Sequence, residues 1–254
     1  MGELYFIGMG LSRSLMTNKA LDIIRKADVI IYDTYTSFSC DISPDYVRSL
    51  TSGKVIEANR DLLENRSAEV ISLAKEKAVV VATVGDPMIA TTHVSMAIEA
   101  RKAGVKVSVV PGVSVHCYLI SKSMLSSYKF GKSVTIVYPS YGIMDTAPYS
   151  VIKSNRSLDI HTILYLDIRE GKFMTPNEAV SLLLQMEDMR KENVIKEDDV
   201  IVVGSRLGCE DEAVVSLSLS EAKKYDFGKP PHILIFPSNL HYMEADALKW
   251  MTTK

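Results

Sequence analysis

The stretch AVVVATVGDPMIATTH, residues 78–93, decides the fold. Three consecutive valines between alanines are typical of a strand buried on both faces of a sheet. Gly85-Asp86-Pro87 then predicts a turn, because glycine and proline interrupt regular structure and aspartate favours turns. Hydroxyl residues lead into a helical pattern. A strand, a turn and a helix in this order are typical of a parallel α/β sheet, in which the loops after the strands bind ligands.

The rest of the first half repeats this pattern, so the sequence predicts a parallel sheet covered by helices. Thr17 is placed to cap the first helix, Ser43 precedes a proline at the start of the second, and Gly104 follows the basic last turn of another. The expected strands are 4–10, 28–33, 54–58, 78–84 and 106–112, and the expected helices are 17–27, 43–50, 64–77 and 91–104.

The second half mixes strands and helices less regularly. We therefore predict an α/β protein of two domains, an N-terminal parallel domain of residues 1–111 and a C-terminal mixed domain of residues 112–254. Expected strands of the second domain are 133–139, 161–168, 198–205, 212–219 and 232–237, and its longer helices are 176–192 and 241–251.

Composition excludes several classes of function. The chain has 254 residues, 47% of them hydrophobic and 24% charged, with a net charge of -2. Interspersed charges of both signs argue against nucleic acid as a partner. The longest apolar runs fall far short of the roughly 18 residues that span a bilayer, and no basic segment precedes the first of them. The five histidines show no metal-ligand spacing. We expect a cytoplasmic protein without a metal site or membrane segment.

The first glycine motif is Gly8-Met9-Gly10, at the end of the first expected strand. Asp33 lies near the distance at which a dinucleotide fold places its acidic residue, but Arg13 occupies the position that needs a small residue. The motif therefore argues against NAD or FAD. A plain strand-to-helix turn and a ligand loop whose amides face the sheet edge both remain open interpretations of these glycines.

Two more loops of this kind follow strands, Gly85-Asp86-Pro87 and Pro111-Gly112-Val113-Ser114. Asp86 can accept hydrogen bonds from a ligand, or it can form an Asx turn that caps the helix beginning near Thr91. Three such loops at one edge would build a site rich in backbone donors and acceptors and poor in charge. That suits a polar small molecule better than a metal or a polyanion.

The order of these motifs resembles the tetrapyrrole methylase superfamily of S-adenosylmethionine-dependent methyltransferases. Within it the chain is most similar to the diphthine synthase family, through stretches that cover nearly the whole length: LYFIGMGL, YTS, GDPMIATTH, YKFGKSVTIVYP, HTILYLDI, NEAVSLLLQMEDMRKE and FGKPPHILIFP. The resemblance implies two α/β domains with a cofactor cleft between them and a homodimer. It places cofactor contacts on Leu11, Asp86, Ile89, Ser114, Val115, Leu166, Leu207 and His232.

PGVS departs from that family toward the corrin and porphyrin methylases, and the GSRLG segment around Leu207 matches loosely. His232, a lone histidine at the start of a strand, also has a plain structural interpretation.

The family's reaction adds methyl groups to the amino group of a modified histidine on translation elongation factor 2, in diphthamide biosynthesis. We expect positioning to dominate catalysis of such a displacement. Tyr35, in the polar segment after the second strand, is the candidate for the substrate side. Two alternatives are a precorrin or porphyrinogen C-methyltransferase, favoured by PGVS, and a non-catalytic module that binds S-adenosylmethionine.

Overall fold

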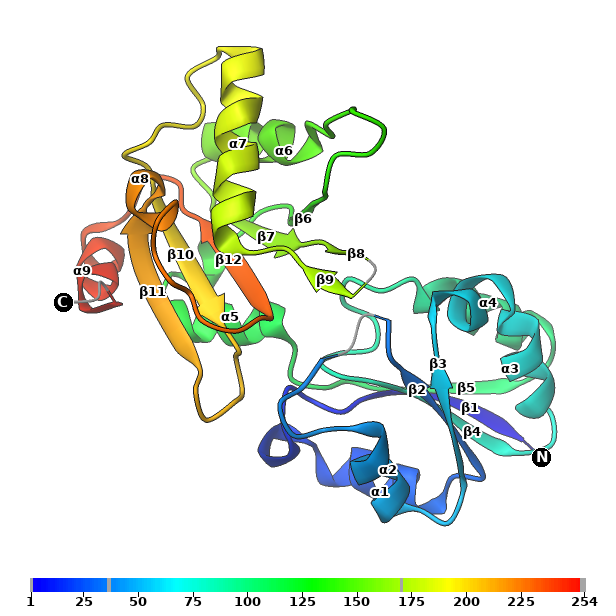
Figure 1. Cartoon of the computed structure of the whole chain (residues 1–254). Helices are drawn as coiled ribbons and strands as arrows, with labels where there is room; N and C mark the ends of the chain where they lie inside the picture. The colour runs from blue at the N-terminus through cyan, green and yellow to red at the C-terminus, as the bar shows by residue number, and fades with distance from the viewer. Residues whose placement is uncertain (1, 36–37, 170, 252–254) are drawn as a thin grey trace. The chain divides into compact units, whose positions relative to one another are not determined.

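The computed structural model describes residues 2–35, 38–169 and 171–251. The fold is α/β, as predicted, and the chain forms two compact units, Met1–Val115 and His116–Lys254 (Figure 1). No helix among the described residues is both long enough and apolar enough to cross a membrane.

The N-terminal unit contains the predicted parallel sheet. All its strand pairs are parallel, in the order β3-β2-β4-β1-β5. The central strand β4 begins the stretch of residues 78–93, and its side chains pack alternately into the two hydrophobic cores on opposite faces of the sheet. The strands are β1 (Glu3–Gly8), β2 (Val29–Asp33), β3 (Lys54–Ala58), β4 (Ala78–Thr83) and β5 (Lys106–Val110). All five expected strands are confirmed.

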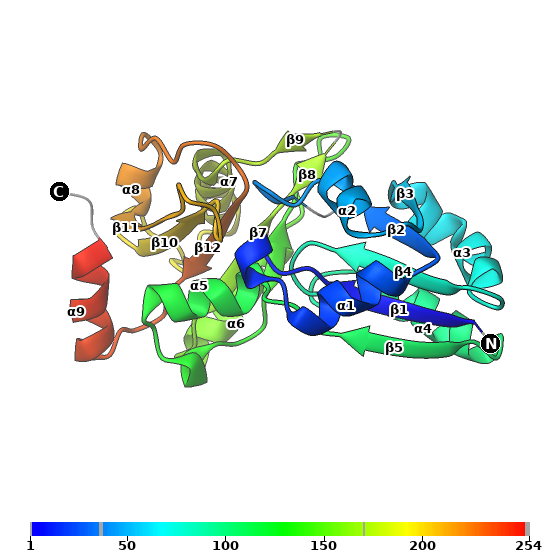
Figure 2. The same ribbon diagram turned by 90° about the horizontal axis from the view of Figure 1, so that it is seen from below.

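Helices cover both faces of this sheet (Figures 1 and 2). Side chains of α1 and α2 join the core of one face, and those of α3 and α4 join the core of the other. The helices are α1 (Asn18–Lys26), α2 (Pro44–Leu50), α3 (Ser67–Leu73) and α4 (His93–Lys102), with a 3-10 turn, Arg13–Leu15, and a π turn, Asp61–Asn65.

The predicted helix ends at Thr17, Ser43 and Gly104 are confirmed, whereas the helix expected over 64–77 is shorter and spans only Ser67–Leu73. The side chain of Thr17 accepts a hydrogen bond from the amide of Ala20, and that of Ser43 accepts one from the amide of Tyr46. Gly104 follows α4 with a φ of +78°, the left-handed conformation that a helix C-terminus favours. The caps at Thr17 and Ser43 fix where α1 and α2 begin, and so where the loops that follow β1 and β2 end.

The C-terminal unit has a mixed sheet in the order β11-β10-β12-β7-β6. β6 and β7 are parallel, and the other neighbours are antiparallel. The strands are β6 (Val134–Ile136), β7 (Thr162–Leu166), β10 (Val200–Ser205), β11 (Ala213–Ser218) and β12 (His232–Phe236), and β8 (Ile168–Arg169) and β9 (Lys172–Phe173) form a separate hairpin.

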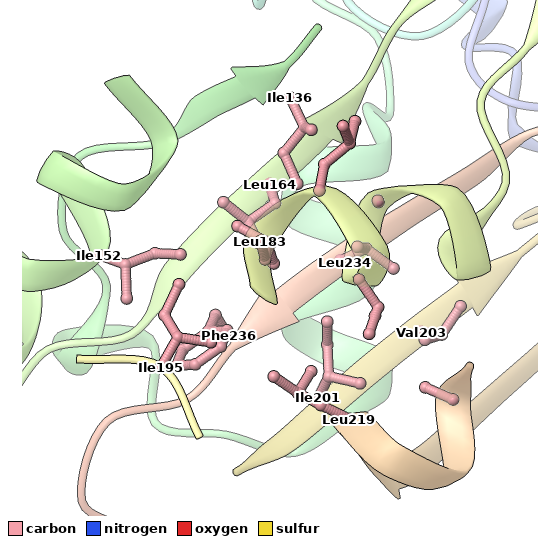
Figure 3. Close-up of a cluster of buried hydrophobic side chains, with 14 of the residues drawn as sticks. Ile136, Ile152, Leu164, Leu183, Ile195, Ile201, Val203, Leu219, Leu234 and Phe236 are labelled. Atoms are coloured by element: carbon pink, nitrogen blue, oxygen red, sulfur yellow. The ribbon is translucent and has the colours of Figure 1, made fainter. Parts of the chain in front are cut away.

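One face of this sheet packs on α6, α7 and α8 through a core that includes Leu183, Leu234 and Phe236 (Figure 3). On the other face Leu119 of α5 lies against Gly204 of β10. The helices are α5 (Val115–Ser123), α6 (Ala147–Ser157), α7 (Pro176–Arg190), α8 (Leu219–Ala222) and α9 (Tyr242–Met251), with a 3-10 turn, Ser127–Lys129.

A buried polar network anchors α9. Glu244 is only 4% exposed, accepts hydrogen bonds from the amides of Ser126 and His241, and lies 3.1 Å from Nε2 of His161. The Nδ1 atom of His161 accepts from the amide of Ser238, so its Nε2 carries the proton that Glu244 accepts. Burial alone would raise the pKa of Glu244, but the hydrogen bonds from His241, Ser126 and His161 outweigh it and lower the pKa to about 2.

Glu244→Gln is expected to lower the free energy of unfolding by about 3 kcal/mol at pH 7, because the folded state favours the ionised carboxylate. A carboxyl group whose folded pKa is depressed contributes stability that is full above its unfolded pKa, near 4.5, and is lost as pH falls toward about 2. Urea unfolding of the parent and of Glu244→Gln should therefore show a difference in unfolding free energy that is constant above pH 5 and becomes smaller below pH 4.5. Asp246→Asn, on the exposed side of α9, is the matched control. A gap unchanged at pH 3 would contradict this prediction.

Candidate functional site

Three glycine loops meet at the carboxyl edge of the N-terminal sheet. Gly10 and Gly85 form a two-way backbone bridge, with N–O distances of 2.8 and 3.3 Å. A Cβ atom added to Gly8 would lie 2.5 Å from the carbonyl oxygen of Gly85 and from the amide nitrogen of Gly112. The loops are thus in direct backbone contact, and glycine is required because no side chain fits between them. The predicted convergence of the loops is confirmed.

Asp86 holds two of these loops together. Its Oδ1 accepts from the amide of Met88 at 2.8 Å, which is an Asx turn, and its Oδ2 accepts from the amide of Gly112 at 3.1 Å. The Asx turn of the structural alternative is therefore present, but the N-cap residue of α4 is Thr92 and not Asp86. Asp86 is half-buried, so its carboxylate combines loop positioning with access to solvent.

The other candidates of the N-terminal unit surround the same loops. Leu11 is 4% exposed, and both its side chain and the Cα of Ser114 lie 3.9 Å from the Cβ position of Gly85. Ser114 is buried, and Val115 begins α5. Ile89 is half-buried in the segment after Asp86. The structure therefore brings Leu11, Asp86 and Ser114 to one place, with apolar side chains beside them.

The candidates of the C-terminal unit also lie at one sheet edge. Ser205 pairs with His232, and Tyr165 pairs with Ile233, so Leu166 lies opposite His232. Leu207, 6% exposed, is in the turn that follows β10. Leu166, Leu207 and His232 thus come from three neighbouring strands at the same end of this sheet.

His232 has an unused hydrogen-bonding atom. Its Nε2 donates to the carbonyl oxygen of Phe227 at 3.3 Å, so its Nδ1 is an acceptor. Nδ1 is buried and has no partner among the described residues, and neither has the hydroxyl of Thr83 at the end of β4. Burial lowers the pKa of His232, which keeps the ring neutral and Nδ1 free to accept. Buried polar atoms without partners are costly, so each of these atoms is suited to a bound polar ligand.

Glu212 positions the turn that carries Leu207, a role that the sequence analysis missed. Its carboxylate accepts from the amide of Gly208 at 2.8 Å and from the hydroxyl of Tyr118 at 2.9 Å, and it pairs with Lys122 at 2.5 Å. These contacts tie the turn to α5. The sequence offered no signal for this role, because Tyr118 and Glu212 are 94 residues apart.

A second polar group lies on the α4 face of the N-terminal sheet. Asp33 ends β2, is fully buried, and accepts from the amide of Tyr35 at 2.8 Å. Its Oδ2 lies 4.0 Å from Nε2 of His93, the first residue of α4. Thr83, the last residue of the neighbouring strand, completes the group. Tyr35 is half-buried, and the guanidinium of Arg60 lies 5.4 Å from its ring centre.

The site offers little that would hold a metal ion. Within the described ranges, no three His, Cys, Asp or Glu side chains are grouped as metal ligands. The edge of the N-terminal sheet offers backbone groups, the carboxylate of Asp86 and the hydroxyl of Thr83 beside the apolar side chain of Leu11. The edge of the C-terminal sheet offers the imidazole of His232 beside Leu207. Each set of groups suits an organic ligand that has polar and apolar parts.

Comparison with known proteins identifies the family. The family profile described as Tetrapyrrole (Corrin/Porphyrin) Methylases matches residues 3–223. The chain therefore belongs to the tetrapyrrole methylase family, as its sequence motifs indicated.

Individual relatives point to one branch of this family. Diphthine synthase of Saccharolobus islandicus (strain L.S.2.15 / Lassen #1) is 53% identical over 254 residues, covering 99% of each chain. Diphthine synthase of Sulfurisphaera tokodaii is 52% identical over 251 residues, covering 98% of each. A crystal structure of diphthine synthase superposes with a TM-score of 0.89 at 34% identity, covering 98% of this chain and 95% of that one. These relatives do not favour the precorrin methyltransferase or the non-catalytic module.

Proposed function

We propose that this chain is an S-adenosylmethionine-dependent methyltransferase that methylates the amino group of the modified histidine of translation elongation factor 2, the reaction of a diphthine synthase. The full-length identity of about half to diphthine synthases carries this proposal. The converging glycine loops support it, because they provide backbone groups and little charge, as a sulfonium cofactor with polar ends and an adenine ring requires.

The residues that would hold S-adenosylmethionine lie at the two sheet edges. In the N-terminal unit they are Leu11, Asp86, Ile89, Ser114 and Val115, and in the C-terminal unit they are Leu166, Leu207 and His232. The unpartnered Nδ1 of His232 supports its role, because a hydrogen-bond donor on the ligand would satisfy it. When bound, the cofactor supplies an electrophilic methyl group on a sulfonium.

The chain's own contribution is to bind and orient the two reactants. Because the acceptor amine attacks in its neutral form, little acid or base chemistry is needed, and positioning supplies most of the rate. A site that excludes water would favour the neutral amine, because desolvation disfavours the ammonium form. Tyr35, held by the Asp33 carboxylate through its backbone amide, is our candidate for the substrate side.

We further propose that the protein acts in the cytoplasm, where its substrate works in translation, and that it forms a homodimer of two-domain subunits with the cofactor between the domains. Sedimentation equilibrium would test the dimer. A mass of about one 28.2 kDa chain at micromolar concentration would contradict it.

Intact mass spectrometry tests the activity. Elongation factor 2 that carries the 3-amino-3-carboxypropyl histidine is incubated with the protein and S-adenosylmethionine, and methyl increments are expected. The same factor with that histidine replaced is the control and should gain none. If no increment forms although calorimetry detects cofactor binding, the proposed substrate is wrong.

A further inference from the structure

A buried acid and histidine connect the two loops that the proposed reaction needs. His93 and Asp33 are 3% and 0% exposed, and they lie with buried Thr83 at the carboxyl edge of a sheet whose core on this face is apolar. Ionisable side chains are rarely buried without a specific partner or role. Neither residue contributes to the apolar core, so their retention at this edge needs another explanation.

The imidazole of His93 fixes the cofactor loop. Its Nδ1 lies 2.9 Å from the carbonyl oxygen of Pro87, which directly follows Asp86. A carbonyl only accepts, so Nδ1 carries a proton and donates it. The ring is held between this carbonyl and the side chain of Phe6, with ring centres 5.8 Å apart. This tautomer turns Nε2 toward the Asp33 carboxylate.

The carboxylate of Asp33 fixes the loop on the proposed substrate side. One oxygen accepts from the amide of Tyr35, and the other faces His93 at 4.0 Å. Asp33 and His93 thus lie in one chain of interactions that runs from Pro87 to Tyr35, while neither is exposed enough to meet a protein substrate itself.

We propose that Asp33 and His93 are positioning residues for the methyl transfer, which couple the placement of the cofactor loop at Pro87 to that of the Tyr35 turn. The inference rests on the proposed function, since Tyr35 is placed on the substrate side there. The two residues act unequally. Asp33 accepts from the amide of Tyr35, whereas His93 contacts the carbonyl of Pro87 and faces Asp33.

Asp33→Asn separates these roles. Its amide oxygen can still accept from the Tyr35 amide, but the charge that faces His93 is lost. We expect the S-adenosylmethionine Kd by calorimetry to stay within about twofold, and the single-turnover rate constant for methyl transfer to the elongation factor to fall about tenfold or more, since small misplacements of reacting groups cost this much. Asp45→Asn, an exposed carboxylate on α2, is the matched control and should change neither quantity.

His93→Phe keeps the ring beside Phe6 and removes both nitrogen atoms. The carbonyl of Pro87 then keeps the hydroxyl of Thr91 as a donor but loses the imidazole. This variant should therefore weaken cofactor binding about threefold or more and also slow transfer. A purely structural role would instead lower thermal stability in both variants without this split between Kd and rate. If Asp33→Asn fails to fold, His93→Phe still tests the inference through the contact with the cofactor loop.

A double-mutant cycle with Tyr35→Phe tests the connection directly. If Asp33 acts through Tyr35, Asp33→Asn costs less in the Tyr35→Phe background than in the parent. Additive losses, or an Asp33→Asn rate within twofold of the parent, would overturn the inference. The parent protein distinguishes a failure of this inference from a failure of the proposed function. If the parent transfers no methyl group, the proposed function is wrong. If the parent transfers methyl groups, the variants test only the positioning roles of Asp33 and His93.

Discussion

Gly112→Ala should destabilise the N-terminal unit by about 3 kcal/mol and weaken binding of S-adenosylmethionine by about tenfold or more. The added Cβ would lie 2.2 Å from the carbonyl oxygen of Gly85 and 2.8 Å from the backbone of Gly8. A Cβ cannot rotate away from a clash, and the obstructing atoms belong to backbone already bonded to Gly10. The loops must therefore separate, which removes the arrangement that we propose for the cofactor.

Urea unfolding and calorimetry measure the two effects of Gly112→Ala. Gly142→Ala is the control, because a Cβ there meets nothing within 4 Å. Its φ of +75° makes alanine unfavourable by about 1 kcal/mol for conformational reasons alone. If Gly112→Ala costs no more than Gly142→Ala and binds the cofactor normally, the close contact of the loops is not essential.

The sequence predicts the N-terminal unit well because its signals are local. Buried parallel strands appear as apolar runs, and Thr17, Ser43 and Gly104 mark helix ends by their own chemistry. The GMG, GDP and PGVS loops follow such strands, so their convergence follows from the parallel sheet. Helix α6 is absent from the predicted elements, although Pro148, Val151 and Ile152 form a buried stripe along it.

The partners of the site residues were not predictable in the same way. Asp86 bonds to Gly112, 26 residues later, and Glu212 bonds to Tyr118, 94 residues earlier. Such pairs depend on strand order, which apolar periodicity does not encode. The contact of His93 with Asp33 arises because α4 begins at His93, close to the residue that ends β2. The roles of Leu11, Ile89, Leu166 and Leu207 remain predictions from resemblance.

Asp86→Ala is the second change with a large expected effect. It removes the acceptor of two backbone amides, those of Met88 and Gly112. Each lost hydrogen bond lowers the free energy of unfolding by about 1 kcal/mol or more. We expect a loss of about 2–3 kcal/mol in unfolding free energy and about tenfold or more in affinity for S-adenosylmethionine, because both the carboxylate and the loop geometry are lost. Calorimetric binding equal to the parent's would show that Asp86 has no role in holding the cofactor.

Asp86→Asn tests whether both carboxylate oxygens are needed as acceptors. An amide has one acceptor atom, so it can keep the Asx turn to Met88 but then presents an NH2 group to the amide of Gly112, donor against donor. Asn should therefore recover only part of the loss. At Asp226, whose carboxylate accepts from the amide of Gly228, the same change keeps this bond and should be nearly neutral. A full recovery at Asp86 would mean that its bond to Gly112 does not hold the two loops together, and that the glycine contacts alone set the site.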